Sequence, residues 1–136
     1  MKLPVLAETL KRIQSNGREE FYGGKTGQIL VKYNNQLGGI FSLEDLKDYQ
    51  AQWREPIHFQ YRDYKMTSMT MPSSGGVCLA QILGGIEPFD LQSMGHNSAD
   101  YIQVIAEAER RAYADRSFYL GDMDFVEVPI AQLIDK

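Results

Sequence analysis

The chain has 136 residues, a formal net charge of −4 and a hydrophobic content of 43%. This length suits one compact unit and is short for two, so we expect residues 1–136 to form a single domain unit. Lysine and arginine are scattered among carboxylates, which argues against a nucleic-acid partner. No apolar run approaches the roughly 20 residues that span a bilayer, and residues 1–14 lack the pattern of a signal peptide. We therefore expect the chain as given to be soluble.

Metal-binding and redox residues are few. Cys78 is the only cysteine, which excludes an internal disulfide and a site built from several cysteines. His58 and His96 are the only histidines, so carboxylates would have to supply most ligands of a zinc site. We expect neither a metal ion nor another cofactor.

Three helices are predicted before residue 50. Apolar residues at three- and four-residue spacing predict a helix over Pro4–Ser15, ended by Gly17, and Arg18–Tyr22 follows as a short connecting segment. Thr26 is a candidate N-cap for a second helix that stops by Gly38. Ser42 and Asp45 resemble a capping box at the start of a helix over Leu43–Tyr49.

The second half predicts a hairpin and two more helices. Alternating β-favouring residues over Ile57–Met71, broken at Arg62 and Asp63, predict two antiparallel strands. A largely buried apolar helix that contains Val77–Leu83 and ends near Gly84-Gly85 or at Pro88 should follow. A long helix over Ala99–Leu120, capped by Asn97 or Ser98, comes after it. The expected fold class is α+β, mostly helical with one antiparallel β-hairpin.

The segment Pro72–Gly76 is most like a functional loop. Backbone N–H groups at a helix start can hold an anion, but a plain strand-to-helix turn with a helix cap needs the same residues and is the interpretation we favour. Ser73 and Ser74 could be nucleophiles only with a base in reach, and just His58 and His96 are available. We do not expect a serine hydrolase triad within the chain.

Other polar groups have simple structural interpretations. Asp115, Asp122 and Asp124 could bind a cation or act as acid and base, but their spacing fits no calcium loop, and solvated acids near a helix end are the favoured interpretation. Glu107 stands four residues before Arg111, which suits a helix-surface ion pair. Trp53 is predicted to be a packing anchor, and the adjacent Arg54 and Glu55 are expected to form an ion pair.

Several motifs, taken in order, resemble the γ-glutamyltransferase family, and this resemblance covers essentially the whole chain. They are Leu43-Glu44-Asp45-Leu46, Trp53-Arg54-Glu55-Pro56, Pro72-Ser73-Ser74-Gly75-Gly76, Gly95-His96-Asn97-Ser98-Ala99, Ala106-Glu107-Ala108, Tyr113-Ala114-Asp115-Arg116 and Tyr119-Leu120-Gly121-Asp122. Leu6–Leu10, Phe125-Val126 and Val128-Pro129 fit the same register.

The resemblance implies a fragment of an αββα N-terminal-nucleophile hydrolase fold, taken from the later part of the large-subunit region. In that family a precursor cuts itself, and the freed N-terminal threonine attacks the γ-glutamyl amide of glutathione and related donors. The family's Thr-Thr-His-type motif, its substrate-clasping small-subunit residues and its earlier large-subunit arginine are absent here. Thr67 and Thr70 stand in the hairpin, and Ser73-Ser74 is not the family's serine pair. We therefore assign no catalytic, cofactor-binding or metal residue.

Three functional hypotheses remain open. The first is a scaffold fragment, a single partial domain that is inactive alone, with the remainder of its precursor as partner. The second is an independent binding module that uses Pro72–Gly76, and the third a complete small hydrolase. The abrupt ends favour the first, because no room precedes Pro4 for a family N-terminal half. The resemblance implies a periplasmic, secreted or cell-surface parent. A fragment should expose apolar surface on the Val77–Leu83 helix and the hairpin, and self-association is the expected relief.

Overall fold

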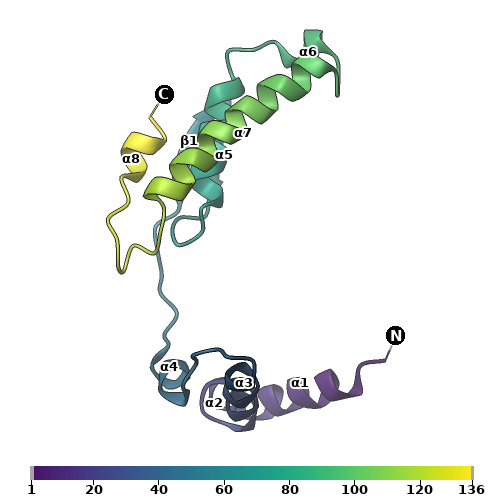
Figure 1. The fold of residues 1–136 in the computed structure, drawn as a ribbon, viewed down its shortest axis with the longest axis vertical. Helices are drawn as coiled ribbons and strands as arrows, with labels where there is room; N and C mark the ends of the chain where they lie inside the picture. The colour runs from purple at the N-terminus through teal and green to yellow at the C-terminus, as the bar shows by residue number, and fades with distance from the viewer. Residues whose placement is uncertain (1, 136) are drawn as a thin grey trace. The chain divides into compact units, whose positions relative to one another are not determined.

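The structure, a computed structural model, describes residues 2–135. Its internal contacts divide the chain into two compact units, Met1–Gln52 (unit 1) and Trp53–Lys136 (unit 2). Helices dominate both units, and one two-stranded antiparallel sheet lies in unit 2, which confirms the predicted α+β class (Figure 1). No helix in the described part of the chain is long and apolar enough to cross a membrane. The single partial domain over 1–136 stays a prediction, because contacts within the chain do not report on polypeptide outside it.

Unit 1 consists of four helices: α1 (Pro4–Asn16), α2 (Arg18–Tyr22), α3 (Lys25–Gln36) and α4 (Leu43–Asp48). Proline at the first position of α1 and Gly17 at φ 60° after its end fit the predicted boundaries. The predicted capping box is also present, since the Asp45 N–H donates to Ser42 Oγ at 3.1 Å and the Ser42 N–H donates to Asp45 Oδ2 at 2.8 Å. The predicted start signals of α1 and α4 are therefore confirmed.

Two details of unit 1 differ from expectation. Arg18–Tyr22 is helical rather than a connecting segment. Thr26 lies inside α3 and is not its N-cap, a position that Gly24 occupies. The hydroxyl of Thr26 donates to Glu20 Oε1 at 2.8 Å, so it joins α3 to a carboxylate on α2 and does not accept from a backbone N–H as an N-cap would. A Cβ atom at Gly24 would lie 2.8 Å from the Cα of Glu20, so glycine allows α2 and α3 to approach closely.

Unit 2 begins with the predicted hairpin. Strands β1 (Ile57–Tyr61) and β2 (Tyr64–Ser68) pair antiparallel, from Ile57 opposite Ser68 to Tyr61 opposite Tyr64. The turn falls at Arg62 and Asp63, as predicted, although β2 ends at Ser68, before the predicted Met71. Ile57 is buried and Phe59 packs on the core, whereas the alternate residues His58 and Gln60 are exposed. One face of the sheet is thus apolar and the other polar.

Helix α5 (Gly75–Ile86) packs between the hairpin and the long helix α7 (Ala99–Tyr119) (Figure 1). A Cβ atom at Gly76 would lie 2.2 Å from the Met69 carbonyl oxygen, so the start of α5 meets the end of the hairpin at a distance that only glycine permits. Gly85 faces the Cβ of Ala108, where an added Cβ would lie 3.5 Å away. Small residues therefore bring α5 and α7 close together.

Helix α5 is largely buried, as predicted, since Val77 is fully buried and Ala80 is 7% exposed. It ends at Ile86, between the two predicted ends, and Ile86 is itself buried. Residues on α7 and the hairpin within the same unit cover most of α5. The apolar surface that we expected a fragment to expose on this helix is therefore limited to Leu79, which is 38% exposed.

The predicted long helix is confirmed over nearly its full length. Ser98 is the N-cap, and its Oγ accepts from the Tyr101 N–H at 3.2 Å. The helix ends at Tyr119, one residue before the predicted end. Glu107 pairs with Arg110 at 2.7 Å rather than with the predicted Arg111, and the Arg110 guanidinium lowers the pKa of Glu107.

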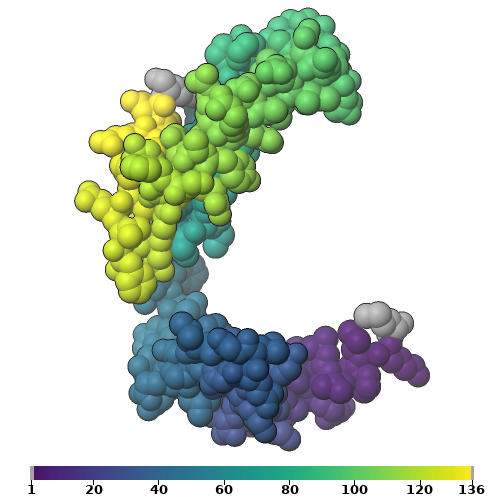
Figure 2. Space-filling view, in the orientation of Figure 1, coloured from purple at the N-terminus to yellow at the C-terminus, as the bar shows by residue number. Residues whose placement is uncertain are grey.

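Two four-residue helices, α6 (Leu91–Met94) and α8 (Ile130–Leu133), were not predicted. They are too short to show a helical period, and Asp90 caps α6 through the Ser93 N–H at 3.2 Å. Val128, just before α8, is buried in the core with Ile57, Met71 and Val77, and Ile130, Leu133 and Ile134 pack against it. Helix α8 contacts α5, and Figure 2 shows the C-terminal segment in yellow.

Candidate functional site

The Pro72–Gly76 segment forms a turn that leads into α5. The Ser73 N–H donates to the Thr70 carbonyl at 3.2 Å, and the Cys78 N–H donates to the Ser74 carbonyl at 3.0 Å. Ser74 occupies the N-cap position, but its side chain makes no cap hydrogen bond. Its Oγ instead accepts from Arg116 Nε at 3.1 Å. The turn is present as predicted and the serine cap is not, because Arg116 on α7 engages the hydroxyl.

Neither histidine is placed to activate Ser73 or Ser74 by a hydrogen bond among the described residues. His58 Nδ1 lies 3.0 Å from Thr67 Oγ1, its partner across the hairpin. The ring of His96 packs edge-on against Tyr101 at 5.7 Å between centroids. By type, Thr67 and His58 could be a nucleophile and its base, a pairing that we did not predict from the sequence. Both side chains are exposed on the polar face of the sheet, so the pair fits an ordinary cross-strand contact.

The three aspartates near the end of α7 do not form one cluster. Asp115 Oδ2 accepts from Gln81 Nε2 at 2.7 Å, on the side of α7 that meets α5. Asp124 and Asp122 lie 2.7 and 3.8 Å from the guanidinium of Arg54. Within residues 2–135, no group of three or more His, Cys, Asp or Glu side chains could hold a metal ion. The favoured interpretation as solvated acids was incomplete, because all three acids have protein partners.

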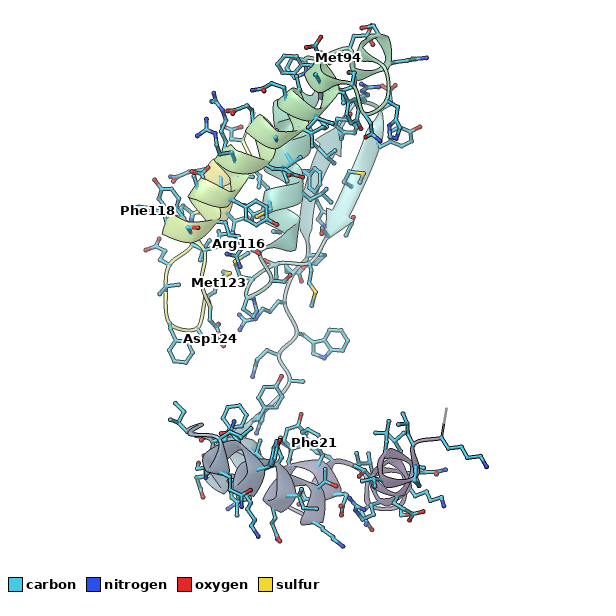
Figure 3. All side chains as sticks on the ribbon, turned by 45° about the vertical axis from the view of Figure 1, so that its right-hand side comes forward. Phe21, Met94, Arg116, Phe118, Met123 and Asp124 are labelled. Carbon is cyan, nitrogen blue, oxygen red and sulfur yellow. The ribbon has the colours of Figure 1, made fainter. Side chains whose placement is uncertain are left out.

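Arg54 connects the entry of the hairpin to the loop that follows α7. Its hydrogen bond to Asp124 raises the pKa of the guanidinium, and the charge of Asp122 adds to this effect. The Asp124 N–H also donates to Asp122 Oδ1 at 3.0 Å, which holds the two acids together. Figure 3 shows Asp124 on this loop and Met123 beside it. These contacts join two segments that are distant in the sequence. Arg54 pairs with Asp124 and Asp122 and not with Glu55, the partner that we expected.

Trp53 is not the packing anchor that its size suggested. Its side chain is fully exposed. It borders a shallow groove of about 690 Å³ in unit 2, whose lining is mainly apolar and includes Ile57, Met123, Ile130 and Ile134. Such a lining suits apolar side chains of another polypeptide rather than a reacting polar substrate.

A polar network in unit 1 was not recognised from the sequence. The Glu20 side chain is buried, and its Oε1 accepts from Arg12 Nε at 2.9 Å, from the Thr26 hydroxyl at 2.8 Å and from the Thr26 N–H at 3.1 Å. The hydrogen bond from Thr26, followed by that from Arg12, lowers the pKa of Glu20. Arg12, Glu20 and Thr26 come from α1, α2 and α3, so only the fold brings them together.

Because the pKa of Glu20 is lowered on folding, we expect the stability of unit 1 to depend on pH. The ionised carboxylate stabilises unit 1 above the pKa of Glu20 in the unfolded chain, and this contribution is lost as the pH falls through the lower pKa of the folded state. Glu20→Gln should therefore reduce the protection of the Thr26 amide at neutral pH and flatten its change under acid. Hydrogen exchange followed by NMR from pH 7 to 3, with exposed Glu19→Gln as control, measures this. Equal protection profiles for the two variants would contradict the role of Glu20.

The family comparison covers the entire chain. The model of the family described as Gamma-glutamyltranspeptidase matches residues 1–136. The glutathione hydrolase proenzyme of Escherichia coli (strain K12) is 47% identical over 131 residues, which are 96% of this chain and 23% of that protein. The glutathione hydrolase proenzyme of Pseudomonas aeruginosa is 45% identical over 134 residues, 97% of this chain and 24% of that protein.

Solved structures agree. The gamma-glutamyltranspeptidase from Pseudomonas nitroreducens complexed with L-DON has a TM-score of 0.86 and 44% identity, over 99% of this chain and 41% of that one. This likeness supports the predicted relation to N-terminal-nucleophile hydrolases. The chain spans about a quarter of the length of the curated relatives that it matches. The full-length family match and the relatives above 40% identity together place this chain in the gamma-glutamyltranspeptidase family.

Proposed function

We propose that this chain is a scaffold part of a γ-glutamyltransferase-like enzyme. The complete enzyme would transfer or hydrolyse the γ-glutamyl group of glutathione and related γ-glutamyl amides through an N-terminal threonine nucleophile, and the chain alone would be inactive. The observation that carries this proposal is the alignment of 96% of the chain with only 23% of a glutathione hydrolase proenzyme. The remainder of the precursor is then the natural partner.

The side-chain contacts of unit 2 support a structural role. Ser74 accepts from Arg116, Gln81 donates to Asp115 and Arg54 pairs with Asp124, so these polar groups join elements of the unit to one another. A nucleophile needs a base in hydrogen-bond reach and donors aimed at the developing oxyanion. Ser74 and Asp115 are suited to such roles by type, but their hydrogen bonds join α5 to α7. His58 and Thr67 form an exposed contact across the hairpin.

The independent binding module is the weaker alternative. It would place an anion at the Pro72–Gly76 turn, where the start of α5 offers backbone N–H groups. Arg116 could assist there, since its Nε already lies 3.1 Å from Ser74 Oγ. The side chain of Arg116 also lies 5.9 Å from the ring centroid of Tyr113, so its position has a packing explanation without a ligand.

The isolated chain is expected to show no turnover of a γ-glutamyl anilide above buffer. The reaction needs an N-terminal threonine nucleophile and oxyanion donors, and we assign neither role to any residue of this chain. Release of the aniline chromophore measures this, with Ser73→Ala and Ser74→Ala proteins prepared alongside as controls for contaminating activity. Turnover by the unmodified chain that disappears in either serine variant would overturn the scaffold proposal.

A further inference from the structure

Unit 1 lacks an apolar core of its own. Among its described residues only Glu20 and Gly27 are buried, and the nine buried hydrophobic residues in the described part of the chain all lie in unit 2. Burial of apolar area is the main term that stabilises a folded domain. The helices of unit 1 therefore need apolar contacts from outside the unit.

The missing contacts leave two exposed apolar stripes. On α1 and its N-cap, Leu3, Leu6 and Leu10 recur at helical spacing and are each about half exposed, at 51%, 50% and 55%. On α3 and its C-cap, Ile29, Tyr33 and Leu37 recur every four residues and are 52%, 61% and 71% exposed. Soluble monomers rarely leave such contiguous apolar surface open, so both stripes have the character of an interface.

The total accessible surface agrees with incomplete burial. It is 10494 Å² for the chain, whereas two separate globular proteins with the sizes of units 1 and 2 would together expose about 8,600 Å². Figure 3 labels Phe21 on α2, whose side chain is 36% exposed and adds to the apolar surface of unit 1.

We propose that the stripes on α1 and α3 are the surface on which unit 1 docks against apolar side chains of the polypeptide that flanks this region in the complete precursor. This inference rests on the proposed function. Its occupant is chosen because about three quarters of the length of the matched relatives lies outside the aligned region, which supplies a covalently linked partner. A linked partner is present at high effective concentration, whereas a second copy would have to associate from solution.

The experiment compares hydrogen exchange in α1 and α3 with and without the flanking polypeptide. One sample is the chain alone, and the other is an exchange protein in which this chain replaces the aligned 131-residue segment of the Escherichia coli glutathione hydrolase proenzyme. Hydrogen exchange read by mass spectrometry should be slower in α1 and α3 of the exchange protein by about tenfold or more. Equally fast exchange in both samples would overturn the docking inference.

A matched pair of variants tests the surface itself. Leu10→Gln replaces a leucine of the α1 stripe, and Ser15→Gln introduces the same side chain at an exposed position on another side of α1. In the exchange protein, Leu10→Gln should remove most of the added protection of α1 and Ser15→Gln should preserve it. In the isolated chain neither variant should matter. Equal effects of the two variants in the exchange protein would show that the stripe is not the docking surface.

Two further readouts separate the inference from the proposed function. Turnover of a γ-glutamyl anilide by the exchange protein reports on the proposed function, whereas the exchange rates of α1 and α3 report on docking. Protected helices in an inactive protein would support docking and count against the proposed function. Unprotected helices in an active protein would support the proposed function and count against docking. Protection that appears in the isolated chain only as its concentration rises would identify a second copy as the occupant and overturn the inference.

Discussion

Met71→Ala is expected to lower the free energy of unfolding of unit 2 by about 2–5 kcal/mol. The Met71 side chain is 1% exposed and packs in the core with Ile57, Val77 and Val128. Removing its outer atoms loses buried apolar area and leaves a cavity between segments that cannot easily collapse, because the hairpin, α5 and the C-terminal segment all meet there. Urea unfolding followed by circular dichroism measures the change.

Met69 provides a control of the same residue type two positions away. It is 71% exposed, so Met69→Ala should alter the free energy of unfolding by less than about 0.5 kcal/mol. The two variants have the same composition and nearly the same place in the chain. If both were equally destabilising, or if Met71→Ala were neutral, the core as described would be wrong.

Ala112→Leu is expected to destabilise unit 2 by about 1–3 kcal/mol through overpacking. Ala112 is 1% exposed and Ala108 is 8% exposed on the face of α7 that contacts α5. Three extra carbon atoms at Ala112 would push the two helices apart or force a side chain out of its preferred rotamer. Thermal or urea unfolding of the purified variant tests this.

The controls for Ala112→Leu lie on the exposed side of α7. Ala114→Leu makes the same substitution at an exposed position, and Glu109→Ala removes a solvated charge. Both should change the free energy of unfolding by less than about 0.5 kcal/mol. A neutral Ala112→Leu together with a severely destabilising Glu109→Ala would mean that α7 faces the opposite way.

Local signals predicted the elements of this fold well. The capping box at Ser42, the Ser98 cap and the turn at Arg62 each depend on residues within four positions of one another, and all three are present. The three- and four-residue spacing of Ile105, Ala108 and Ala112 likewise indicates the buried side of α7, where Ala108 and Ala112 are buried. Such features are decided by neighbouring residues, so a single sequence contains them.

Features that depend on distant residues were missed. Trp53 looked like an anchor, but whether a large side chain is buried depends on what lies over it, and nothing in the described part of unit 2 covers it. Arg54 pairs with Asp124, 70 positions away, rather than with its neighbour Glu55. Thr26 donates to Glu20 on another helix instead of capping its own. The apolar run of α5 indicated that this helix is buried, but not that α7 and the hairpin cover it.

The functional interpretation came from ordered motifs rather than from a constellation of reactive groups. No single motif is specific, yet several in the right order indicated the family that the full-length match supports. Some side chains of those motifs join elements of unit 2. Ser74 and Arg116, for example, belong to two different motifs and hydrogen-bond to each other.

The most direct test of the scaffold proposal is γ-glutamyl anilide turnover by the exchange protein, measured beside the isolated chain at equal molar concentration. The chain should be a working substitute for the segment that it matches at 47% identity, so the exchange protein should turn over the substrate while the isolated chain does not. Turnover by the isolated chain, or an exchange protein that folds but neither matures nor reacts, would contradict a scaffold role in a γ-glutamyltransferase-like enzyme.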